Sequence, residues 1–162
     1  MNSDKFNNDK KSSKSYLLRN GSVIDVLNKK ILKNDLFIKN QIIEKIGKDL
    51  SSQIDKDTEI IECKNLFISP GFIDMRVNIS EPGNEHKETI KTASMSAAAG
   101  GVTSIICMPN TVPPIDQPAI IQSIQRKARE VALSKIFCTG CITRNFEGNE
   151  ICELHLMKES GA

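Results

Sequence analysis

Short apolar runs separated by turn-forming residues dominate the first part of the chain. In "YLLRNGSVID" two such runs flank Asn20-Gly21, a dipeptide that suits a tight hairpin because both of its residues accept a positive φ. The pattern recurs in "DLFIKNQIIEKIG", where Lys39-Asn40 supply the turn, and "TEIIECKNLFIS" adds two more short apolar pieces. Residues 16–69 are therefore predicted to form a small all-β unit of paired strands.

The pattern changes at Pro70-Gly71, after which apolar segments alternate between strand-like and helix-like periods. This alternation predicts parallel strands joined by right-handed helical crossovers. Three βα units are too few for a closed (β/α)₈ barrel of about 250 residues, so residues 70–162 are either a small open sheet or the front of a larger barrel. The predicted strands are 72–79, 102–108 and 135–141, and the predicted helices are 85–99, 116–133 and 149–161.

Two of these helices carry clear local signals. Gly100-Gly101 is a good stop for the first, and a phosphate-binding loop is disfavoured there because the pair follows a helix and precedes a strand. Asp116 and Pro118 mark the start of the second helix. Its apolar stripe faces a core and consists of Ile120, Ile121, Ile124, Ala128 and Val131.

Composition narrows the class of protein. The 162 residues are 39% apolar, which allows a real core, and the net charge of +2 with six Phe, one Tyr and no Trp argues against a nucleic-acid partner. No apolar run approaches the roughly 20 residues that span a bilayer, so no membrane partner is expected. Residues 1–15 are polar and are predicted to be a disordered tail. With no secretory signal, the five cysteines are expected to be reduced thiols in a cytoplasmic protein.

Two polar residues interrupt the first strand of the alternating region. Arg76 and Asn78 are two residues apart, so in a strand through Ile79 they point to the same face. A cation and an amide aimed from an apolar strand at one spot suggest a pocket.

Residues 70–118 resemble the dihydroorotase family of the amidohydrolase superfamily. The resemblance rests on "PGFIDM", "EPGNEHKET", "AAAGGVTSIICMPNT" and "PPID", which stand in the family's order and spacing. It implies an α/β fold: the start of a (β/α)₈ amidohydrolase barrel, with three βα units in residues 70–162, preceded by a small β-sandwich portion in residues 16–69. "NEICELHLMKESGA" then matches the helix before the fourth barrel strand.

The resemblance also implies where the site lies. The family's first barrel strand normally ends in His-x-His-x-Arg, whose histidines bind zinc and whose arginine holds the substrate carboxylate; here these positions are Arg76, Asn78 and Ser80. A guanidinium has no lone pair for a metal, an amide oxygen is a weak zinc ligand, and a serine cannot form a bidentate fork. Asn110, in "MPNT", matches an asparagine that helps to hold the substrate. These four residues are the predicted substrate pocket, with no catalytic residue, no metal ligand and no cofactor expected, although active relatives use zinc.

The family resemblance leaves several functions open. Some members lack the metal ligands and serve as structural partners of aspartate transcarbamoylase, so we expect a catalytically inactive, dihydroorotase-like protein of pyrimidine biosynthesis. Its partner would be that enzyme, an active dihydroorotase or a second copy of itself. The alternative is an active zinc-dependent dihydroorotase that interconverts N-carbamoyl-aspartate and dihydroorotate. A third interpretation, a small-molecule binding module, rests only on Asn110 and the three substituted positions.

A second candidate site lies near the C-terminus. Cys138, Cys141, Cys152 and His155 form a C-x₂-C-x₁₀-C-x₂-H row, whose spacing resembles a structural zinc site. Residues three apart on a strand face opposite sides, however, so the row needs a bend at Gly140. Small buried cysteines are the favoured interpretation, and a redox C-x-x-C is disfavoured because that motif opens a helix.

The histidine of "EPGNEHKET" has a simpler interpretation. His86 is predicted to begin the first helix as a surface or capping residue, in an acidic first turn that suits the helix dipole.

Overall fold

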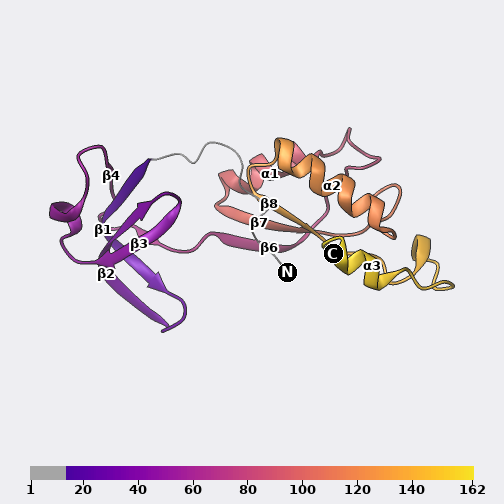
Figure 1. The fold of residues 1–162 in the computed structure, drawn as a ribbon, viewed down its shortest axis with the longest axis horizontal. Coiled ribbons are helices and arrows are strands. Elements are labelled where there is room, and N and C mark those ends of the chain that lie inside the picture. Colours follow the sequence, from indigo (N-terminus) through magenta and orange to yellow (C-terminus); the bar gives the residue numbers. More distant parts are fainter. Residues whose placement is uncertain (1–13) are drawn as a thin grey trace. The chain divides into compact units, whose positions relative to one another are not determined.

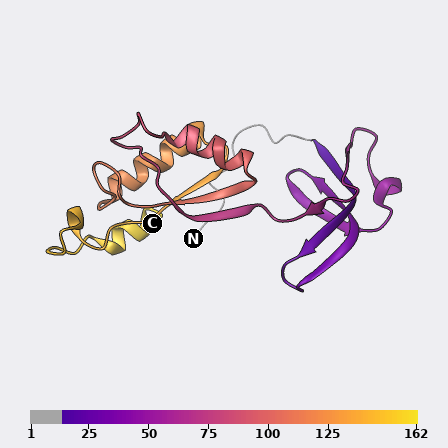
Figure 2. The same ribbon diagram turned by 180° about the vertical axis from the view of Figure 1, so that it is seen from behind.

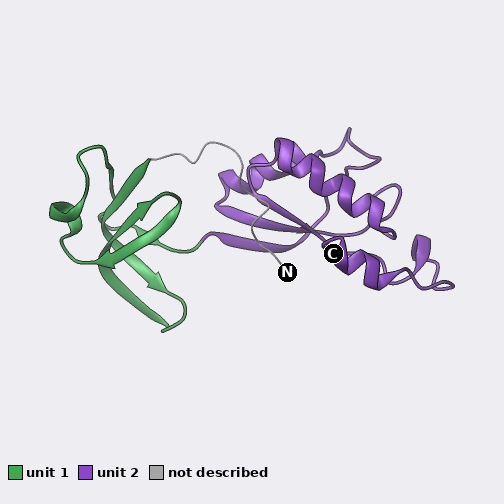
Figure 3. Ribbon diagram, viewed as in Figure 1, with its two compact units in different colours: residues 1–70 green, residues 71–162 purple. Residues whose placement is uncertain are grey.

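The computed structural model describes residues 14–162. It divides into two compact units, Met1–Pro70 and Gly71–Ala162, coloured green and purple in Figure 3. The division coincides with the change of sequence pattern at Pro70-Gly71. The predicted disordered tail, 1–15, lies outside the described residues except for its last two, and Ser15 is already the buried first residue of a strand.

The first unit is a five-stranded sheet within the described residues, with the order β3-β2-β1-β4 and with β5 also paired to β1 (Figure 1). β1 is antiparallel to β2 but parallel to β4 and β5, so the central strand is paired along both edges. The paired strands predicted from the sequence are present. Their bounds are β1 (Ser15–Asp25), β2 (Lys30–Lys39), β3 (Ile42–Gly47), β4 (Glu59–Glu62) and β5 (Phe67–Ile68).

The hairpin predicted at Asn20-Gly21 is wrong. β1 runs straight through this dipeptide, and the register with β2 shifts between Leu18 and Gly21, which is a β-bulge. The positive φ of Asn20 (61°) serves the bulge instead of a turn. Gly21 also lies close to β5, because a Cβ there would be 2.8 Å from Cγ1 of Ile68 and the Ile68 side chain would have to move.

The chain actually reverses after Asp25. The Asp25 carboxylate accepts hydrogen bonds from the backbone N and the side-chain Nδ2 of Asn28, at 3.0 and 2.7 Å, and these bonds lower the pKa of Asp25. The second hairpin is close to its predicted position: Asn40 and Gln41 take positive φ values of 51° and 65°, one residue later than expected.

A buried carboxylate organises the interior of the first unit. Asp35 in β2 is only 5% exposed. Its Oδ1 accepts a hydrogen bond from the backbone N of Asn20 at 2.8 Å, and its Oδ2 accepts one from the backbone N of Leu50 at 3.0 Å. Asp35 therefore connects the β1 bulge to the short 3₁₀ helix η2 (Leu50–Gln53), beside a buried cluster of Leu17, Phe37 and Leu50.

The second unit alternates strands and helices as predicted. Its parallel strands have the order β6-β7-β8. Helices α1 and α2 lie on one side of this sheet, as the front and back views in Figures 1 and 2 show. The bounds are β6 (Phe72–Val77), α1 (Ile90–Ala99), β7 (Val102–Cys107), α2 (Pro118–Val131), β8 (Lys135–Cys138) and α3 (Leu154–Glu159).

The core of the second unit forms between sheet and helices. The predicted stripe of α2 is confirmed, since its three isoleucines are buried and Ala128 and Val131 pack against the same cluster. Burying one such side chain fully stabilises the fold by about 1.5–3 kcal/mol. The residues buried most completely here are Ile79, Ile90, Ser94, Ile105, Cys107, Ile115, Ile121 and Met157.

The first helix begins five residues later than predicted. Thr89 is its N-cap, and Thr89 and Thr92 exchange side-chain and backbone hydrogen bonds in a capping box. His86 therefore lies in the turns that precede α1 and does not begin a helix. The stop at Gly100-Gly101 is confirmed: the backbone N of Gly100 donates to Ser96 and Ala97 oxygens, and Gly101 has a φ of 77°.

The remaining elements are shorter than predicted. Strand β6 ends at Val77 instead of Ile79, and β8 ends at Cys138. The third helix has six residues, because residues 143–152 form turns closed by a bridge between Thr143 and Ile151. Among residues 14–162, every helix is too short or too polar to cross a membrane.

We expect the 162-residue chain to associate or aggregate in solution. Strands β6 and β8 lie at the two edges of the described sheet, and both carry exposed apolar side chains: Phe72, Ile73 and Met75 on β6 and Phe137 on β8. Unpaired edges with apolar side chains favour intermolecular strand pairing. Size-exclusion chromatography with light scattering should show oligomers, and the Met75→Lys, Phe137→Lys variant should show fewer. A single sharp monomer peak for the wild type would contradict this expectation.

Candidate functional site

The carboxyl ends of the three parallel strands meet at one edge of the second unit. Backbone bonds hold these ends together: N of Met108 donates to O of Val77 at 2.9 Å, and N of Thr139 donates to O of Cys107 at 3.0 Å. The Thr139 hydroxyl donates to the same Cys107 oxygen at 2.8 Å. In (β/α) barrels the active site lies at this edge. The loops after β6, β7 and β8 are therefore the candidate site region.

Arg76 lies one residue before the end of β6 and is exposed. Its backbone N donates to Oδ1 of Asp74 at 3.0 Å, next to a register shift in which Asp74 pairs with Ile105 and Val77 pairs with Cys107. The guanidinium makes no ion pair within the described residues. Arg76 is therefore a positive charge without an ion-pair partner among the described residues, close to the end of β6.

Asn78 follows β6 directly, so the strand alternation used to align it with Arg76 stops one residue short of it. It is exposed and borders a cavity of about 200 Å³ between β6 and α1. Two carboxylates, Asp74 and Glu88, line that cavity, and most of its other lining residues are apolar. Arg76, Ser80 and Asn110 do not line this cavity.

The other two predicted pocket residues lie in loops. Ser80 is half-buried, and its backbone oxygen accepts from N of Asn84 at 2.8 Å. Asn110 is exposed in the loop after β7. This loop is closed by a hydrogen bond of 3.0 Å from N of Ile115 to O of Pro109.

A contact between these two loops was not predicted from the sequence. The backbone N of Val112 donates to O of Pro82 at 3.0 Å. Gly83 follows with a φ of 99°, and a Cβ at this position would lie 2.8 Å from the carbonyl carbon of Val112. The signal in the sequence was the glycine of "EPGNEHKET", since only glycine combines a positive φ with so close an approach.

Carboxylates support the loop before α1. Oε2 of Glu81 accepts from the backbone N of Ile90 at 2.8 Å, which satisfies a free N–H at the start of the helix. Oε1 of Glu85 accepts from N of Gly83 at 2.8 Å, and this bond lowers the pKa of Glu85. Both carboxylates therefore have structural partners.

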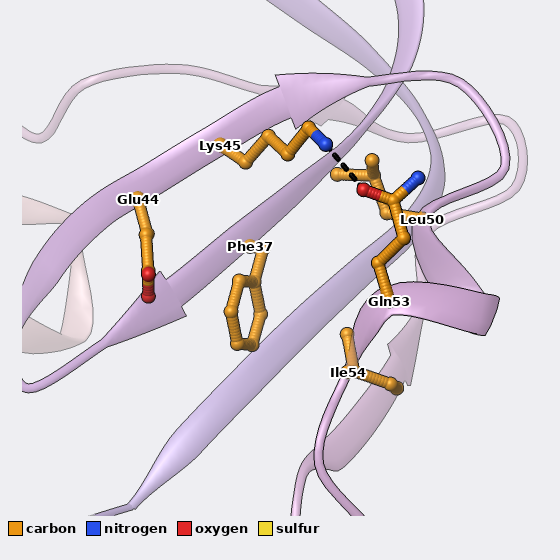
Figure 4. A pocket seen from close by; sticks show the side chains of 6 residues that line it. All are labelled: Phe37, Glu44, Lys45, Leu50, Gln53 and Ile54. Atoms are coloured by element: carbon orange, nitrogen blue, oxygen red, sulfur yellow. Dashed lines mark hydrogen bonds between the residues drawn. The ribbon is translucent and has the colours of Figure 1, made fainter.

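The first unit has a cavity of its own, of about 340 Å³ (Figure 4). Phe37, Leu50 and Ile54 give it an apolar lining, and Nζ of Lys45 donates to Oε1 of Gln53. Glu44 is the one carboxylate that lines it. Nothing in this lining pairs a nucleophile with a base, so the cavity shows packing and no catalytic arrangement.

Comparison with known proteins decides the family. The model of the Dihydro-orotase-like family matches residues 65–162, which is more than half of the chain. The chain belongs to the dihydroorotase-like family. The dihydroorotases of Caldicellulosiruptor saccharolyticus and Aquifex aeolicus are similar to it, with 43% identity over 146 residues and 39% over 145 residues. Each alignment covers 90% of this chain and 34% of the relative, so the chain spans about a third of the length of these relatives.

Solved structures show the fold of this dihydroorotase-like chain. An L-hydantoinase (dihydropyrimidinase) from Arthrobacter aurescens superposes with a TM-score of 0.72 at 24% identity, covering 83% of this chain and 28% of that one. A D-hydantoinase (dihydropyrimidinase) from Thermus sp. gives 0.67 at 24% identity, covering 89% and 30%. Residues 71–162 are the start of a (β/α)₈ amidohydrolase barrel, and the strands of the first unit precede it.

The end of the first barrel strand does not fit a zinc ion. Where the family resemblance places two histidines, this dihydroorotase-like chain has a guanidinium, which repels a cation, and an amide, which binds zinc weakly. Within residues 14–162 no group of three or more His, Cys, Asp or Glu side chains could hold a metal. Zinc ligands elsewhere in a full-length protein would have to bind the metal without the two histidines of the first strand.

The cysteine–histidine row does not converge. Cys138, Cys141 and Cys152 are buried, whereas the side chain of His155 is 82% exposed and lies 3.4 Å from Glu159. Cys152 precedes α3 and His155 lies within it, so these two residues do not share a helix face. Burial raises the pKa of Cys141 to about 11, the opposite of the lowered pKa that a redox C-x-x-C needs.

Proposed function

We propose that this chain is the N-terminal part of a dihydroorotase-like protein of pyrimidine biosynthesis that does not hydrolyse cyclic amides and serves as a structural partner of aspartate transcarbamoylase. One observation carries the proposal: Arg76 and Asn78 occupy the end of the first barrel strand, where the family resemblance places a zinc-binding histidine pair. Without that pair the protein lacks the ligands that begin a metal centre.

The fixed charge of Arg76 supports this proposal. A guanidinium stays protonated at all physiological pH values, so the position carries a permanent positive charge without a metal. That charge can substitute for the missing metal charge, or it can pair with an acidic group at the same site. Asn78 and Asn110, both exposed near the same edge, add neutral polar groups and no proton-transfer chemistry.

Zinc content and dihydroorotate hydrolysis of the intact protein test the proposal. We expect no tightly bound zinc at the first-strand pocket and no turnover with added zinc, while the 43% identical Caldicellulosiruptor dihydroorotase serves as the positive control. The Arg76→His, Asn78→His variant restores both imidazoles and should take up more zinc than the wild type. Tight binding of one or two zinc ions by the wild type, or turnover that disappears when Arg76 or Asn78 is altered, would refute the proposal.

The proposed partnership has its own readout. The intact protein mixed with aspartate transcarbamoylase should elute as one complex in size-exclusion chromatography. Separate elution at micromolar concentrations would remove the partner from the proposal without restoring catalysis.

An active dihydroorotase is the second candidate. It is favoured by the relatives, since those that match at 36–43% identity carry that name. The same zinc and hydrolysis assays separate the two candidates.

A further inference from the structure

Four of the five cysteines lie in the core of the second unit, and two of them are direct neighbours. Cys107 is the last residue of β7 and Cys138 is the last residue of β8, and the two are paired in the register of these parallel strands. Paired residues on adjacent parallel strands point to the same side of the sheet, and the strands lie about 4.8 Å apart. Disulfides span Cα separations of roughly 4.4–6.8 Å, so the backbone places this pair within bonding reach.

The two thiols also interact directly. Cys107 is 1% exposed and Cys138 is 3% exposed, and both belong to the cluster between sheet and helices. The proximity of the two thiols lowers the pKa of Cys107 and raises the pKa of Cys138, and burial also raises the pKa of Cys138. The proposed function uses neither thiol.

We propose that Cys107 and Cys138 are a redox modification site, which a hydroperoxide oxidises to a disulfide joining β7 to β8. The Cys107 thiol loses its proton and the thiolate attacks one peroxide oxygen, so that an S–O bond forms and the O–O bond breaks. The leaving oxygen takes up that proton and departs as water or an alcohol, which leaves a sulfenic acid on Cys107. The sulfur of Cys138 then displaces the hydroxyl group, the S–S bond forms, and a second water leaves with the Cys138 proton. Two electrons pass from the sulfurs to the peroxide.

Access to the pair depends on local opening. Ile121 and Ile124 of α2 belong to the same buried cluster, so an oxidant reaches the sulfurs only when the helix moves from the sheet. Oxidation is therefore slow in the native chain and faster in mild denaturant. Cys141 is a poorer nucleophile, because burial raises its pKa and it has no partner in strand register.

The disulfide would covalently link the edge strand β8 to its neighbour β7. It closes a loop from residue 107 to residue 138 that contains the whole of α2. Constraining a loop of this size removes entropy from the unfolded chain and stabilises the folded one. This disulfide would lie beside the hydrogen bonds that Thr139 donates to the Cys107 backbone oxygen, at the sheet edge where the candidate site lies.

The test is oxidation of the full 162-residue chain by hydrogen peroxide at low protein concentration, followed by denaturation, alkylation and mass spectrometry. We expect an intramolecular link between the peptides that contain Cys107 and Cys138, reversed by dithiothreitol and formed faster in mild urea. Cys138→Ser should abolish this link, while Cys63→Ser, in the other unit, and Cys152→Ser should retain it. The oxidised wild type should unfold at a temperature higher by roughly 5 °C or more than the reduced form.

Three results would overturn the proposal: free Cys107 and Cys138 after prolonged oxidation in mild urea, a predominant link from either of them to another cysteine, or an unchanged unfolding temperature in the linked chain. Peptide mapping of the wild type decides the connectivity even if a serine variant fails to fold. The outcome is independent of the proposed function, because neither zinc content nor hydrolysis enters this test.

Discussion

Replacing Gly83 with alanine is expected to destabilise the second unit by about 3 kcal/mol. Gly83 has a φ of 99°, and an added Cβ would press on the Val112 carbonyl group, which belongs to the backbone and cannot rotate away. The change would separate the two loops that the bond from Val112 to Pro82 joins. Urea unfolding followed by far-ultraviolet circular dichroism measures the loss.

Gly148 provides a matched control for this substitution. It also has a positive φ, 76°, but a Cβ there would meet nothing within 4 Å. Gly148→Ala should therefore cost only the backbone strain, about 1 kcal/mol. Equal losses in the two variants would show that the contact with Val112 is not what makes Gly83 necessary.

Removing the buried carboxylate of the first unit should have an effect of similar size. Asp35→Ala leaves the backbone N–H groups of Asn20 and Leu50 without their acceptors, and we expect a loss of about 3–4 kcal/mol. The bulge in β1 and the start of η2 depend on these two bonds. Denaturant unfolding of the variant, monitored by hydrogen exchange at Asn20 and Leu50, measures both the energy and its location.

Two controls isolate the role of this carboxylate. Asp35→Asn keeps one acceptor oxygen at the same place, so it should lose about half as much stability as the alanine variant. Asp25→Ala removes a carboxylate that also accepts two hydrogen bonds but is not buried, and it should cost clearly less stability than Asp35→Ala. If Asp35→Ala costs no more than Asp25→Ala, burial of the carboxylate does not matter.

Periodicity over long segments predicted the fold well. The stripe of α2 appears in the structure because 14 residues of helix repeat the same signal four times. The alternation of strands and helices after Pro70 likewise predicted the parallel order β6-β7-β8, since right-handed crossovers leave few other arrangements. The family resemblance then extended three βα units to a barrel.

Short sequence motifs gave wrong predictions where contacts with a distant segment determine the local conformation. Asn20-Gly21 has the conformational freedom of a turn, but the close approach of Ile68 and the Asp35 carboxylate turn it into a bulge. Thr89 and Thr92 form the capping box of α1, with Thr92 at the position that Glu or Gln usually occupies. The helix therefore starts after His86. Asp35 was not singled out from the sequence, because β2 also contains lysines and an asparagine, so one more charge there does not mark a buried site.

The candidate site shows the same limit. Spacing brought the residues 138, 141, 152 and 155 into a metal-like row, but spacing cannot show that α3 starts only at Leu154 and turns His155 outward. Alternation placed Arg76 and Asn78 on one face, and it holds only as far as Val77, where β6 ends. The contact between Gly83 and Val112 joins two loops, and no periodic sequence pattern predicts such a contact.

The division into two units, each with its own buried cluster, has an optical consequence. Tyr16 is the only tyrosine, tryptophan is absent, and Tyr16 lies half-buried in β1 of the first unit. Tyrosine fluorescence therefore does not report on the barrel portion, whereas the α-helices found in residues 14–162, which dominate the far-ultraviolet dichroism, all belong to that portion. The two signals report different halves of the chain, so emission should follow the loss of Asp35 and ignore the loss of Gly83.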